Sequence, residues 1–301
     1  MTIEGQQFTS RMLRWPKLVA QSVLPGPAEN RTQARRRIAL FFHKQFSREM
    51  TFERNGFLWT GTPECLISES IFLHDHYQDD SIDGLVKFLK FKRPTVVNVG
   101  AAIGDVALPF SRKWKKVVAI EPTPSTFARL QRNVRQNNLE EIITCYRAAI
   151  SDVNGERDLV VYDEPAGCEL VGDDGKVSYS VHRILERVAV ETWRLDTLLE
   201  SLHVAPNEVD LVWSDTQGFE SQVMESAPNL WAGGTCLWVE IWPQGLEAHG
   251  GNSRFVATCK KYFSRFVSEK GLNGDTQSMD ALDPIVEALA YGEHVDVLLI
   301  P

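Results

Sequence analysis

Residues 94–122, PTVVNVGAAIGDVALPFSRKWKKVVAIEP, decide the fold of this chain. A short apolar run at residues 95–99 is followed by a turn of small residues and by a helical pattern over residues 105–113. A second apolar run at residues 117–120 ends on Glu121. Strand, tight turn, helix, strand and acid in this order are typical of the first βαβ unit of a nucleotide-binding sheet.

The turn after the first strand favours the close approach of a ligand to the backbone. Gly100 allows a sharp turn, and Ala102 and Gly104 carry no long side chain that would stand in the way. Glu121 is placed to accept hydrogen bonds from two ribose hydroxyls. The turn reads G-x-A-x-G-D and not G-x-G-x-x-G, so it predicts an adenosine-containing ligand without the spacing suited to a pyrophosphate. A tight βα turn that binds nothing is the alternative left open here.

Composition narrows the class of protein. The chain has 301 residues, of which 43% are hydrophobic, so it can bury a substantial core. Its formal net charge of -8 argues against a general nucleic-acid binder, which the basic cluster at residues 35–37 would otherwise support. No run approaches the roughly 18 apolar residues of a membrane span.

The number and spacing of the cysteines indicate the redox state of the cellular compartment. The five cysteines are scattered, odd in number and without a C-x-x-C pair, which indicates neither a zinc site nor a disulfide framework. We therefore expect a reduced, cytoplasmic protein.

Two domains are expected. Residues 1–62 form an N-terminal extension with a helix at residues 31–46 and a hairpin at residues 51–60, whose turn is Asn55-Gly56. Residues 63–301 alternate strands with helices, which predicts an α/β fold with a largely parallel sheet and helices on both faces. The expected strands after the βαβ start lie at residues 142–150, 159–162, 188–193, 209–214, 235–241, 266–268 and 295–300, and the expected helices at residues 79–89, 124–137, 195–202 and 251–263.

Polar residues gather at the predicted strand ends. Besides the Gly100 turn and Glu121, Asp215 and Gln217 follow one buried-type strand, and Glu240 lies at the end of the next. The carboxyl ends of parallel strands meet at one edge of a sheet, where ligands bind. We interpret this grouping as an active site, although each residue alone can also cap a helix or form an internal ion pair.

Several motifs in fixed order resemble the FkbM family of S-adenosylmethionine-dependent methyltransferases. The resemblance covers about residues 85–243. It is carried by VVNVGAAIGDVALPFS, VVAIEPTPSTFARLQRNVRQNN, RAAISDVNGERDL, VETWRLDTLL, VDLVWSDTQGFESQVMESA and TCLWVEIWP.

The family resemblance implies a Rossmann-like class I methyltransferase fold, with a seven-stranded sheet whose last strand, near residues 295–300, runs antiparallel. It implies S-adenosylmethionine as cofactor and S-adenosylhomocysteine as product. The turn would wrap the methionine part, Glu121 the ribose and residues 149–152 the adenine, with Asp215 beside the sulfonium and the acceptor. The implied cofactor-binding set is Asn98, Gly100, Ala101, Ala102, Gly104, Asp105, Glu121, Pro122, Ala149, Asp152 and Asp215.

Three positions depart from the family pattern. Asn98 stands where an acid is usual, and Ala102 where an asparagine is frequent. Gln217 replaces the glutamate of D-x-E-G-x-E, and an amide cannot act as a base. Asn98 can still hydrogen-bond the cofactor's amino group, directly or through water.

An alcohol acceptor must lose its proton as the new bond forms, so a base within reach is expected. The candidates are Asp215, Glu240 and His182. His182 follows a polar, glycine-rich segment at residues 164–180 that we interpret as a lid or substrate loop. Gln217 and Trp242 are the expected acceptor-binding residues, the latter as a stacking surface for a ring. No adjacent Asp-Asn pair lies near Asp215, so a metal is not expected.

The sequence therefore predicts an S-adenosylmethionine-dependent O-methyltransferase. The expected acceptor is a hydroxyl of a saccharide, glycolipid precursor or secondary metabolite, with neither nucleic acid nor a membrane span involved. Three alternatives remain: a non-catalytic cofactor-binding module, a methyltransferase with a protein acceptor, and a nicotinamide-dependent oxidoreductase, whose fingerprint the turn lacks. A homodimer is left open.

Overall fold

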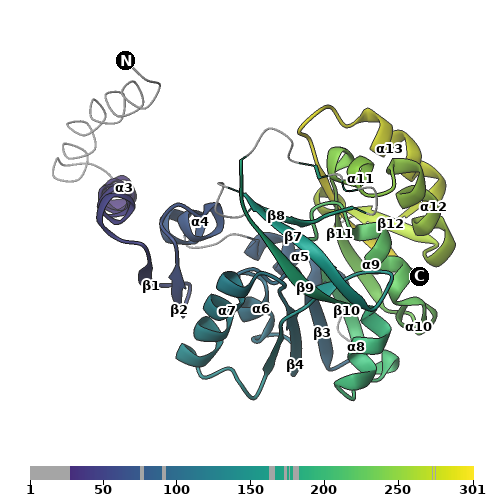
Figure 1. Ribbon diagram of the computed structural model, residues 1–301, viewed down its shortest axis with the longest axis horizontal. Coiled ribbons are helices and arrows are strands. Elements are labelled where there is room, and N and C mark those ends of the chain that lie inside the picture. Colours follow the sequence, from purple (N-terminus) through teal and green to yellow (C-terminus); the bar gives the residue numbers. More distant parts are fainter. Residues whose placement is uncertain are drawn as a thin grey trace. The chain divides into compact units, whose positions relative to one another are not determined.

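The computed structural model describes residues 28–74, 78–89, 93–162, 167–172, 175, 177–178, 183–272, 274 and 276–301 (Figure 1). The chain divides into two compact units, Met1–Tyr77 and Gln78–Pro301. The boundary expected between residues 62 and 63 precedes a helix, α4 (Leu66–His74), that lies in the first unit. Within the described residues, no helix has both the length and the apolar character needed to span a membrane.

The first unit contains two helices and a hairpin. Helix α3 (Ala28–Phe46) is followed by β1 (Met50–Arg54), β2 (Phe57–Gly61) and α4. The Asn55-Gly56 turn has positive φ at both residues, 49° and 68°, which confirms the two-residue hairpin. The rings of Phe52 and Phe72 meet edge to face with centroids 5.1 Å apart, which joins the hairpin to α4.

The second unit is built on one large sheet. Its strand order is β13-β12-β14-β11-β10-β3-β4-β5. β14 runs antiparallel to both neighbours, as expected for the last strand, and the strands from β11 to β5 are parallel. Seven strands were expected; the two-residue strand β13 adds an eighth at the edge. Its strands and helices are α5 (Asp79–Leu89), β3 (Thr95–Val99), α6 (Ala107–Phe110), β4 (Lys116–Ile120), α7 (Pro124–Gln136), β5 (Ile143–Tyr146), α8 (Leu195–Ser201), β10 (Val209–Ser214), α9 (Glu220–Ser226), α10 (Pro228–Ala232), β11 (Cys236–Ile241), α11 (Pro243–Ala248), α12 (Asn252–Tyr262), β12 (Arg265–Ser268), β13 (Gln277–Ser278), α13 (Leu282–Ala288) and β14 (Val295–Ile300).

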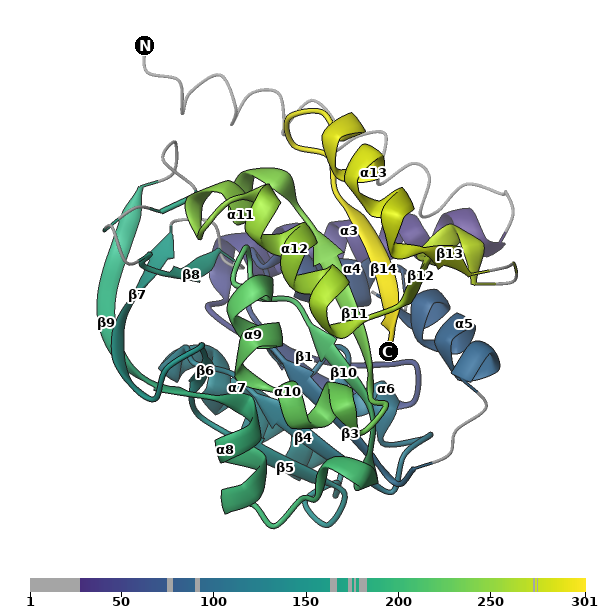
Figure 2. The same cartoon turned by 90° about the vertical axis from the view of Figure 1, so that its right-hand side faces the viewer.

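Helices cover both faces of this sheet (Figure 2). Alternate side chains of a strand point to opposite faces, so each face offers apolar side chains on which helices pack. On one face Val97 and Val99 lie in the main core cluster with Leu198 of α8, Val223 of α9 and Phe255 of α12. On the other face the rings of Trp213 and Trp238 stack with centroids 5.1 Å apart. The ring of Phe110 from α6 lies 5.8 Å from that of Trp213. The predicted two-sided α/β layering is therefore confirmed.

The helix after the cofactor-type turn is shorter than the sequence predicts. Residues 105–113 were expected to be helical, but α6 spans only Ala107–Phe110. Pro109 has no N–H to donate to the carbonyl of Asp105, so the first turn lacks a regular hydrogen bond.

The strand expected at residues 142–150 is two strands. β5 ends at Tyr146, whose carbonyl accepts the amide of Glu121 at 3.1 Å. Pro122 comes next and has no N–H, so the ladder with β4 cannot continue. The chain then enters a second, four-stranded sheet of order β6-β9-β7-β8. Its strands are β6 (Ala149–Ile150), β7 (Gly155–Tyr162), β8 (Cys168–Leu170) and β9 (Ile184–Trp193).

This second sheet was not expected from the sequence. The runs at residues 159–162 and 188–193 form an antiparallel pair within it, and not two more strands of the main sheet. The expected lid segment, residues 164–180, contributes β8, and the rest of it lies partly outside the described residues.

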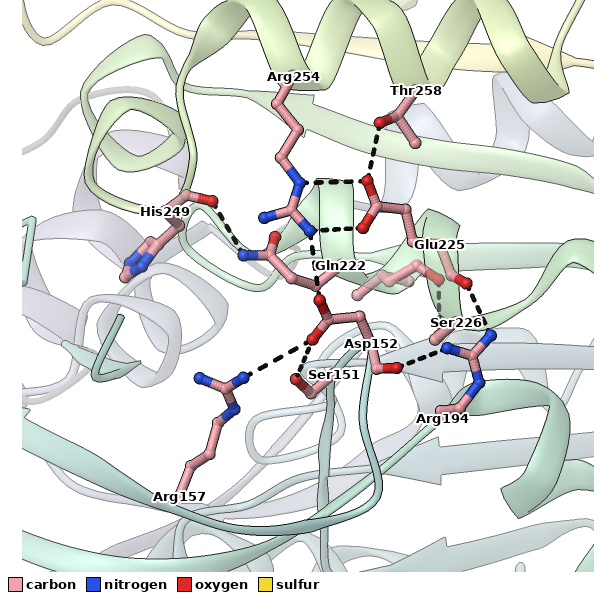
Figure 3. A network of polar contacts seen from close by, with 11 residues as sticks. Ser151, Asp152, Arg157, Arg194, Gln222, Glu225, Ser226, His249, Arg254 and Thr258 are labelled. Carbon is pink, nitrogen blue, oxygen red and sulfur yellow. Dashed lines mark hydrogen bonds and ion pairs between the residues drawn. The ribbon is translucent and has the colours of Figure 1, made fainter. Parts of the chain in front are cut away.

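A polar network ties the turn after β6 to helices of the main sheet (Figure 3). Arg254 of α12 donates from Nε to Glu225 of α9 at 3.1 Å and approaches Asp152 at 3.3 Å. Arg157 of β7 reaches the other carboxylate oxygen of Asp152 at 3.7 Å. Arg194 donates to the backbone carbonyls of Asp152 and Glu225, at 2.5 and 2.8 Å. Charged and polar contacts thus tie the turn after β6 to helices α9 and α12, beside the apolar packing of the second sheet.

Replacing Arg254 by Met should lower the free energy of unfolding by about 1–3 kcal/mol, because two partly buried carboxylates lose a charged donor. Lys260→Met is the matched control. Lys260 lies on the same helix and pairs with Asp283 at 2.6 Å, but it is solvent-exposed, and its loss should not change stability measurably. Denaturant titration measures both, and equal midpoints for the two variants would contradict the anchoring role.

Candidate active site

The ends of β3 and β10 meet at the turn after β3. The amide of Asp215 donates to the carbonyl of Val99 at 3.1 Å. Gly100 has a φ of 80°, and a Cβ at this position would lie 1.9 Å from the carbonyl oxygen of Asp215. Only glycine allows both the left-handed conformation and this close approach. The turn and Asp215 therefore form one rigid piece.

The same turn is fastened to the end of β4. The amides of Gly100 and Ala101 both donate to the carbonyl of Ile120, at 3.0 and 2.9 Å. Ala102 is left-handed with a φ of 45°, and its amide donates to Oε2 of Glu121 at 3.0 Å. A Cβ on Gly104 would lie 2.6 Å from Leu108, so this position is small because α6 packs on it.

Glu121 is 4% exposed and has both carboxylate oxygens engaged. Oε1 accepts the amide of Thr123 at 2.9 Å, while Oε2 accepts that of Ala102. Burial raises the pKa of Glu121 to about 7, although the hydrogen bonds from Thr123 and Ala102 oppose the rise. Each carboxylate oxygen has a second lone pair, so two hydroxyls of a ribose can still be accepted.

Asn98, on β3 between Ala119 and Trp213, is 1% exposed. Neither atom of its side-chain amide has a hydrogen-bond partner among the described residues. An unsatisfied buried amide costs about 1–3 kcal/mol, so a native partner from outside the chain is the economical explanation. A polar cofactor group or a water at this strand end fits that requirement.

A second left-handed turn carries Asp215. Gln217 has a φ of 56°, and its Nε2 donates to Oδ1 of Asp215 at 2.6 Å. Glu220 closes the turn from the other side, accepting the amide and the hydroxyl of Thr216 at 3.0 and 2.9 Å. The carboxylate of Asp215 is thereby held in one orientation. Its pKa is raised by burial, against the lowering effect of the Gln217 hydrogen bond.

A third acid and its neighbour lie on adjacent antiparallel strands. Glu240 of β11 is the register partner of Asp296 on β14. Burial, together with the negative charges of Asp215, Asp296 and Glu220, raises the pKa of Glu240 to about 9. The pKa of Asp296 rises to about 7 through burial and the charge of Asp215. Glu240 therefore keeps its proton at neutral pH, which favours Asp215 over Glu240 as the base.

Two expected acceptor residues, Trp242 directly before α11 and Gln217 in the Asp215 turn, both lie beside Gly245. A Cβ on Gly245 would lie 2.3 Å from Cε3 of Trp242 and 3.2 Å from the carbonyl oxygen of Gln217. A Cβ on Gly218 would lie 2.4 Å from the carbonyl of Gly245. The Trp242 ring thus lies on glycine backbone directly beside the Asp215 turn.

Other expected site residues have different neighbours. Ala149 is buried in a small cluster with Phe219 and Leu159. The carboxylate of Asp152 is engaged by arginines in the network of Figure 3. Pro122 ends the β4 ladder and Asp105 lies in the turn before α6, largely buried. Their cofactor roles stay predictions, and His182 lies outside the described residues.

Two features of the site have no signal in the sequence. The hydroxyl of Thr123 donates to Sγ of Cys168 at 3.2 Å, which places β8 beside Glu121. Burial and the charge of Glu121 raise the pKa of this thiol to about 12.

The other feature is a buried polar cluster beside the Asp215 turn. Glu169 accepts hydrogen bonds from the hydroxyl of Tyr162 and, at 2.7 Å, from the amide of Ser178. Nε2 of His249 lies 3.3 Å from Oε2 of Glu169, although the two residues are 80 positions apart in the sequence. The ring of His249 lies 4.5 Å from that of Phe219. Burial alone would raise the pKa of Glu169, but hydrogen bonds from His249, Ser178 and Tyr162 together hold it below its usual value.

The geometry can be compared with known proteins at this point. The family model described as Methyltransferase FkbM domain matches residues 98–256, more than half of the chain. The chain belongs to the FkbM methyltransferase family. Membership confirms the family expected from the sequence, and the enzyme class with it: this FkbM protein is an S-adenosylmethionine-dependent methyltransferase. The matched residues begin at Asn98 and include the turn, Glu121, the Asp215 turn and Glu240.

Solved structures resemble the FkbM protein only distantly. A putative transferase PH0793 from Pyrococcus horikoshii is 14% identical, covers 88% of this chain and 81% of its own, and has a TM-score of 0.43. TYW2 from P. horikoshii, in complex with MeSAdo, is 15% identical over 84% of this chain and 70% of its own, with a TM-score of 0.42. TYW2 from M. jannaschii, in complex with AdoMet, is 12% identical over 84% and 85%, with a TM-score of 0.41. No curated protein matches the chain.

The residues at the three strand ends fit the family's cofactor. The buried carboxylate has spare acceptor capacity for the hydroxyls of a ribose. The glycine backbone and the unpartnered amide can hydrogen-bond an amino group and a carboxylate. Among the described residues, no group of three or more His, Cys, Asp or Glu side chains is arranged to hold a metal ion. The expectation that no metal assists stays a prediction.

Gly100→Ala should lower the free energy of unfolding by about 3 kcal/mol or more, since left-handed strain and overlap with the Asp215 carbonyl add. Gly175→Ala is the matched control: its φ is 79°, and no atom of the described residues lies within 4 Å of a Cβ there. Only the strain of the left-handed backbone, about 1 kcal/mol, should then lower the free energy of unfolding. Thermal and denaturant unfolding compare the two, and equal losses would contradict the close contact of β3 with β10.

The acidic edge should make the protein less stable as the pH rises. Glu240 is shifted from 4.5 to about 9 in the folded state, so between these values the folded protein holds a proton that the unfolded chain has released. Stability is therefore present below the lower value and is lost as pH rises through the upper one. As the pH rises from acidic to alkaline, the free energy of unfolding of Glu240→Gln should increase relative to that of wild type by at least about 1 kcal/mol, the equivalent of one pKa unit.

Chemical denaturation at several pH values measures this difference. Glu141→Gln, an exposed carboxylate before β5, is the control and should differ from wild type by a constant amount. A constant difference for Glu240→Gln as well would contradict the buried, protonated state of Glu240.

Proposed function

We propose that this enzyme transfers the methyl group of S-adenosylmethionine to a hydroxyl oxygen of a saccharide, glycolipid precursor or secondary metabolite. One observation carries the proposal. The Asp215 carboxylate, with its pKa raised by burial, is fixed by a 2.6 Å hydrogen bond from Gln217 at the turn where the cofactor is expected. A carboxylate that accepts protons more readily than usual suits an alcohol acceptor, which has a proton to lose.

The cofactor is proposed to lie along the three parallel strand ends. When bound, it supplies an electrophilic methyl group on a sulfonium. The turn at Gly100–Gly104 and the Asn98 amide hold its methionine part, and Glu121 accepts hydrogen bonds from the ribose. Cys168 and Thr123 border the ribose side, because their side chains lie against the Glu121 carboxylate.

The protein's contribution to the reaction is alignment and proton acceptance. Asp215 takes the proton of the acceptor hydroxyl as the oxygen–carbon bond forms. Gln217 cannot accept a proton, but its amide keeps one oxygen of Asp215 occupied and leaves the other available. Glu240, protonated at neutral pH, orients the acceptor by hydrogen bonding. His182, outside the described residues, is proposed only as an alternative base.

The acceptor is proposed to carry a ring. Trp242 lies directly after β11 and beside the Gln217 carbonyl, so an aromatic surface adjoins the proposed base. Aromatic side chains in such positions stack on sugars and other rings. Placed this way, a ring hydroxyl can reach Asp215 while its ring rests on Trp242.

An acceptor panel tests the proposal. Purified full-length enzyme is incubated with radiolabelled S-adenosylmethionine and with monosaccharides, glycolipid analogues, phenols, aliphatic amines and peptides. Transfer to hydroxyl compounds, lost in Trp242→Ala, supports the proposal. Transfer to peptides alone favours the protein-acceptor alternative. Cofactor binding without transfer to any class favours the non-catalytic alternative.

Calorimetric titration separates cofactor-binding residues from the base. Glu121→Ala should weaken S-adenosylmethionine and S-adenosylhomocysteine binding about tenfold or more, because two hydrogen bonds to a charged acceptor are lost. Asp215→Asn keeps a similar shape, so it should leave this affinity nearly unchanged and reduce turnover. NAD should not bind to either variant or to wild type. Equal loss of affinity in both variants would make Asp215 a cofactor ligand.

A further inference from the structure

Two carboxylates of the candidate site lie on the same face of the main sheet. Trp213 of β10 is the register partner of Trp238 on β11, and Glu240 comes two positions after Trp238. Glu240 is in turn the register partner of Asp296 on β14. Register partners, and residues two apart on one strand, point to the same face. Glu240 and Asp296 therefore share the face of the stacked tryptophans, and neither belongs to the main core cluster on the other face.

Asp215 extends this row from the end of β10. Its amide donates to the carbonyl of Val99 at 3.1 Å, so Asp215 continues the ladder between β10 and β3 two positions after the tryptophan of β10. We call Asp215, Glu240 and Asp296 the carboxylate row. Each of the three is half-buried. The row therefore remains accessible to a molecule that binds at the ends of the parallel strands.

The charged groups around the carboxylate row are mostly negative. Glu220 closes the turn after β10 and is 2% exposed, and Glu269, directly after β12, adds its charge to that of Asp296. Among the described residues, no lysine or arginine forms an ion pair with the row. The imidazole that does is His294, before β14, whose Nε2 lies 3.8 Å from Oε1 of Glu240 and whose side chain is 56% exposed. One exposed imidazole cannot balance so many acids, so the row must retain protons or attract a cation.

The row retains protons in the free enzyme. Burial and the neighbouring acids raise the pKa of Glu240 to about 9 and that of Asp296 to about 7. Burial raises the pKa of Asp215 as well, against the hydrogen bond from Gln217 and the charge of His294. Acids this close titrate as one unit. A positive charge brought alongside such a unit favours the carboxylate form and expels a proton.

We propose that the carboxylate row selects the charged methyl donor: the sulfonium of S-adenosylmethionine displaces a proton from the row, and the neutral thioether of S-adenosylhomocysteine does not. The inference rests on the proposed placement of the cofactor at these strand ends. Donor and product differ by one methyl group and one positive charge, and the charge is the feature that a carboxylate recognises. Glu240 and Asp296 are then residues that determine donor specificity.

This selection serves the reaction twice. Asp215 must be deprotonated before it can accept the proton of the acceptor hydroxyl, and the charge of the bound donor favours that state. After transfer the product carries no charge on sulfur, so the row holds it less tightly than the donor. The proton taken from the acceptor restores the protonation that the row has in the free enzyme. Each turnover thus releases one proton, which leaves when the next donor binds.

Calorimetric titration counts this proton. Full-length protein is titrated with S-adenosylmethionine and with S-adenosylhomocysteine, each in phosphate and in Tris, two buffers that differ in ionisation enthalpy. The apparent enthalpy of donor binding should differ between the buffers by the equivalent of about half a proton or more, and that of product binding should not. The ratio of donor to product affinity should rise about tenfold between about pH 6 and about pH 8, because half a proton per site gives a factor of about three per pH unit.

Two variants with nearly unchanged shape assign the effect to the row. Glu240→Gln and Asp296→Asn should each reduce the proton release on donor binding by about half or more and flatten the pH dependence of the affinity ratio. Ionisable groups of the ligands contribute equally in every variant, so the difference from wild type isolates the row. Asp280→Asn is the matched control, because its carboxylate is 92% exposed, and it should behave as wild type. Denaturant unfolding confirms that each variant is folded.

Three results would overturn the proposal. The first is an affinity ratio that does not change with pH in wild type. The second is a proton release that is equal for donor and product. The third is a proton release that both variants leave intact, which would assign it to other groups. The proposed function fails separately: transfer to amines or peptides alone would overturn the hydroxyl acceptor and leave the selection of the donor standing.

Discussion

The contact between the ends of β3 and β10 is the constraint on which the site depends. The Gly100 backbone and the Asp215 carbonyl lie too close for any side chain between them. Because the same turn also donates two amides to the end of β4, three parallel strands are locked at one edge. The Gly100 turn, Glu121 and Asp215 therefore cannot move independently. Alignment, which methyl transfer chiefly requires, follows from backbone packing and not from flexible side chains.

Burial of carboxylates is the second organising feature. Glu121, Glu220, Glu240 and Asp296 all have pKa values raised mainly by burial. Such a group is costly to keep in its charged form, and the fold retains several at one sheet edge. Clusters of this kind are found where proton transfer occurs, because neighbouring environments separate the acids that hold protons from those that accept them. In the proposed reaction Glu240 belongs to the first class and Asp215 to the second.

Much of the main sheet was predictable from local sequence. Its inner strands are predominantly apolar runs, as buried parallel strands are. In the first unit, Asn55-Gly56 specifies the hairpin by turn chemistry alone. The strand-end residues followed from topology, since parallel strands end at one edge. The short α6 depends on a single proline whose effect the apolar pattern conceals. The second sheet escaped prediction because its pairing is long-range, and no local pattern distinguishes β9 from another strand of the main sheet. The Glu169–His249 contact joins residues too distant in sequence for any spacing motif.

The second sheet also has a place in the chain that bears on how this enzyme can change. It occupies residues 149–193, between one strand of the main sheet and the helix that returns to it. Its ties to the rest are the arginine network, the buried Glu169–His249 contact, the hydrogen bond from Thr123 to Cys168, and the packing of Phe219 in its core cluster. A graft in its place would have to supply a carboxylate for Arg254, a carboxylate for His249, an acceptor for the Thr123 hydroxyl and an apolar surface for Phe219.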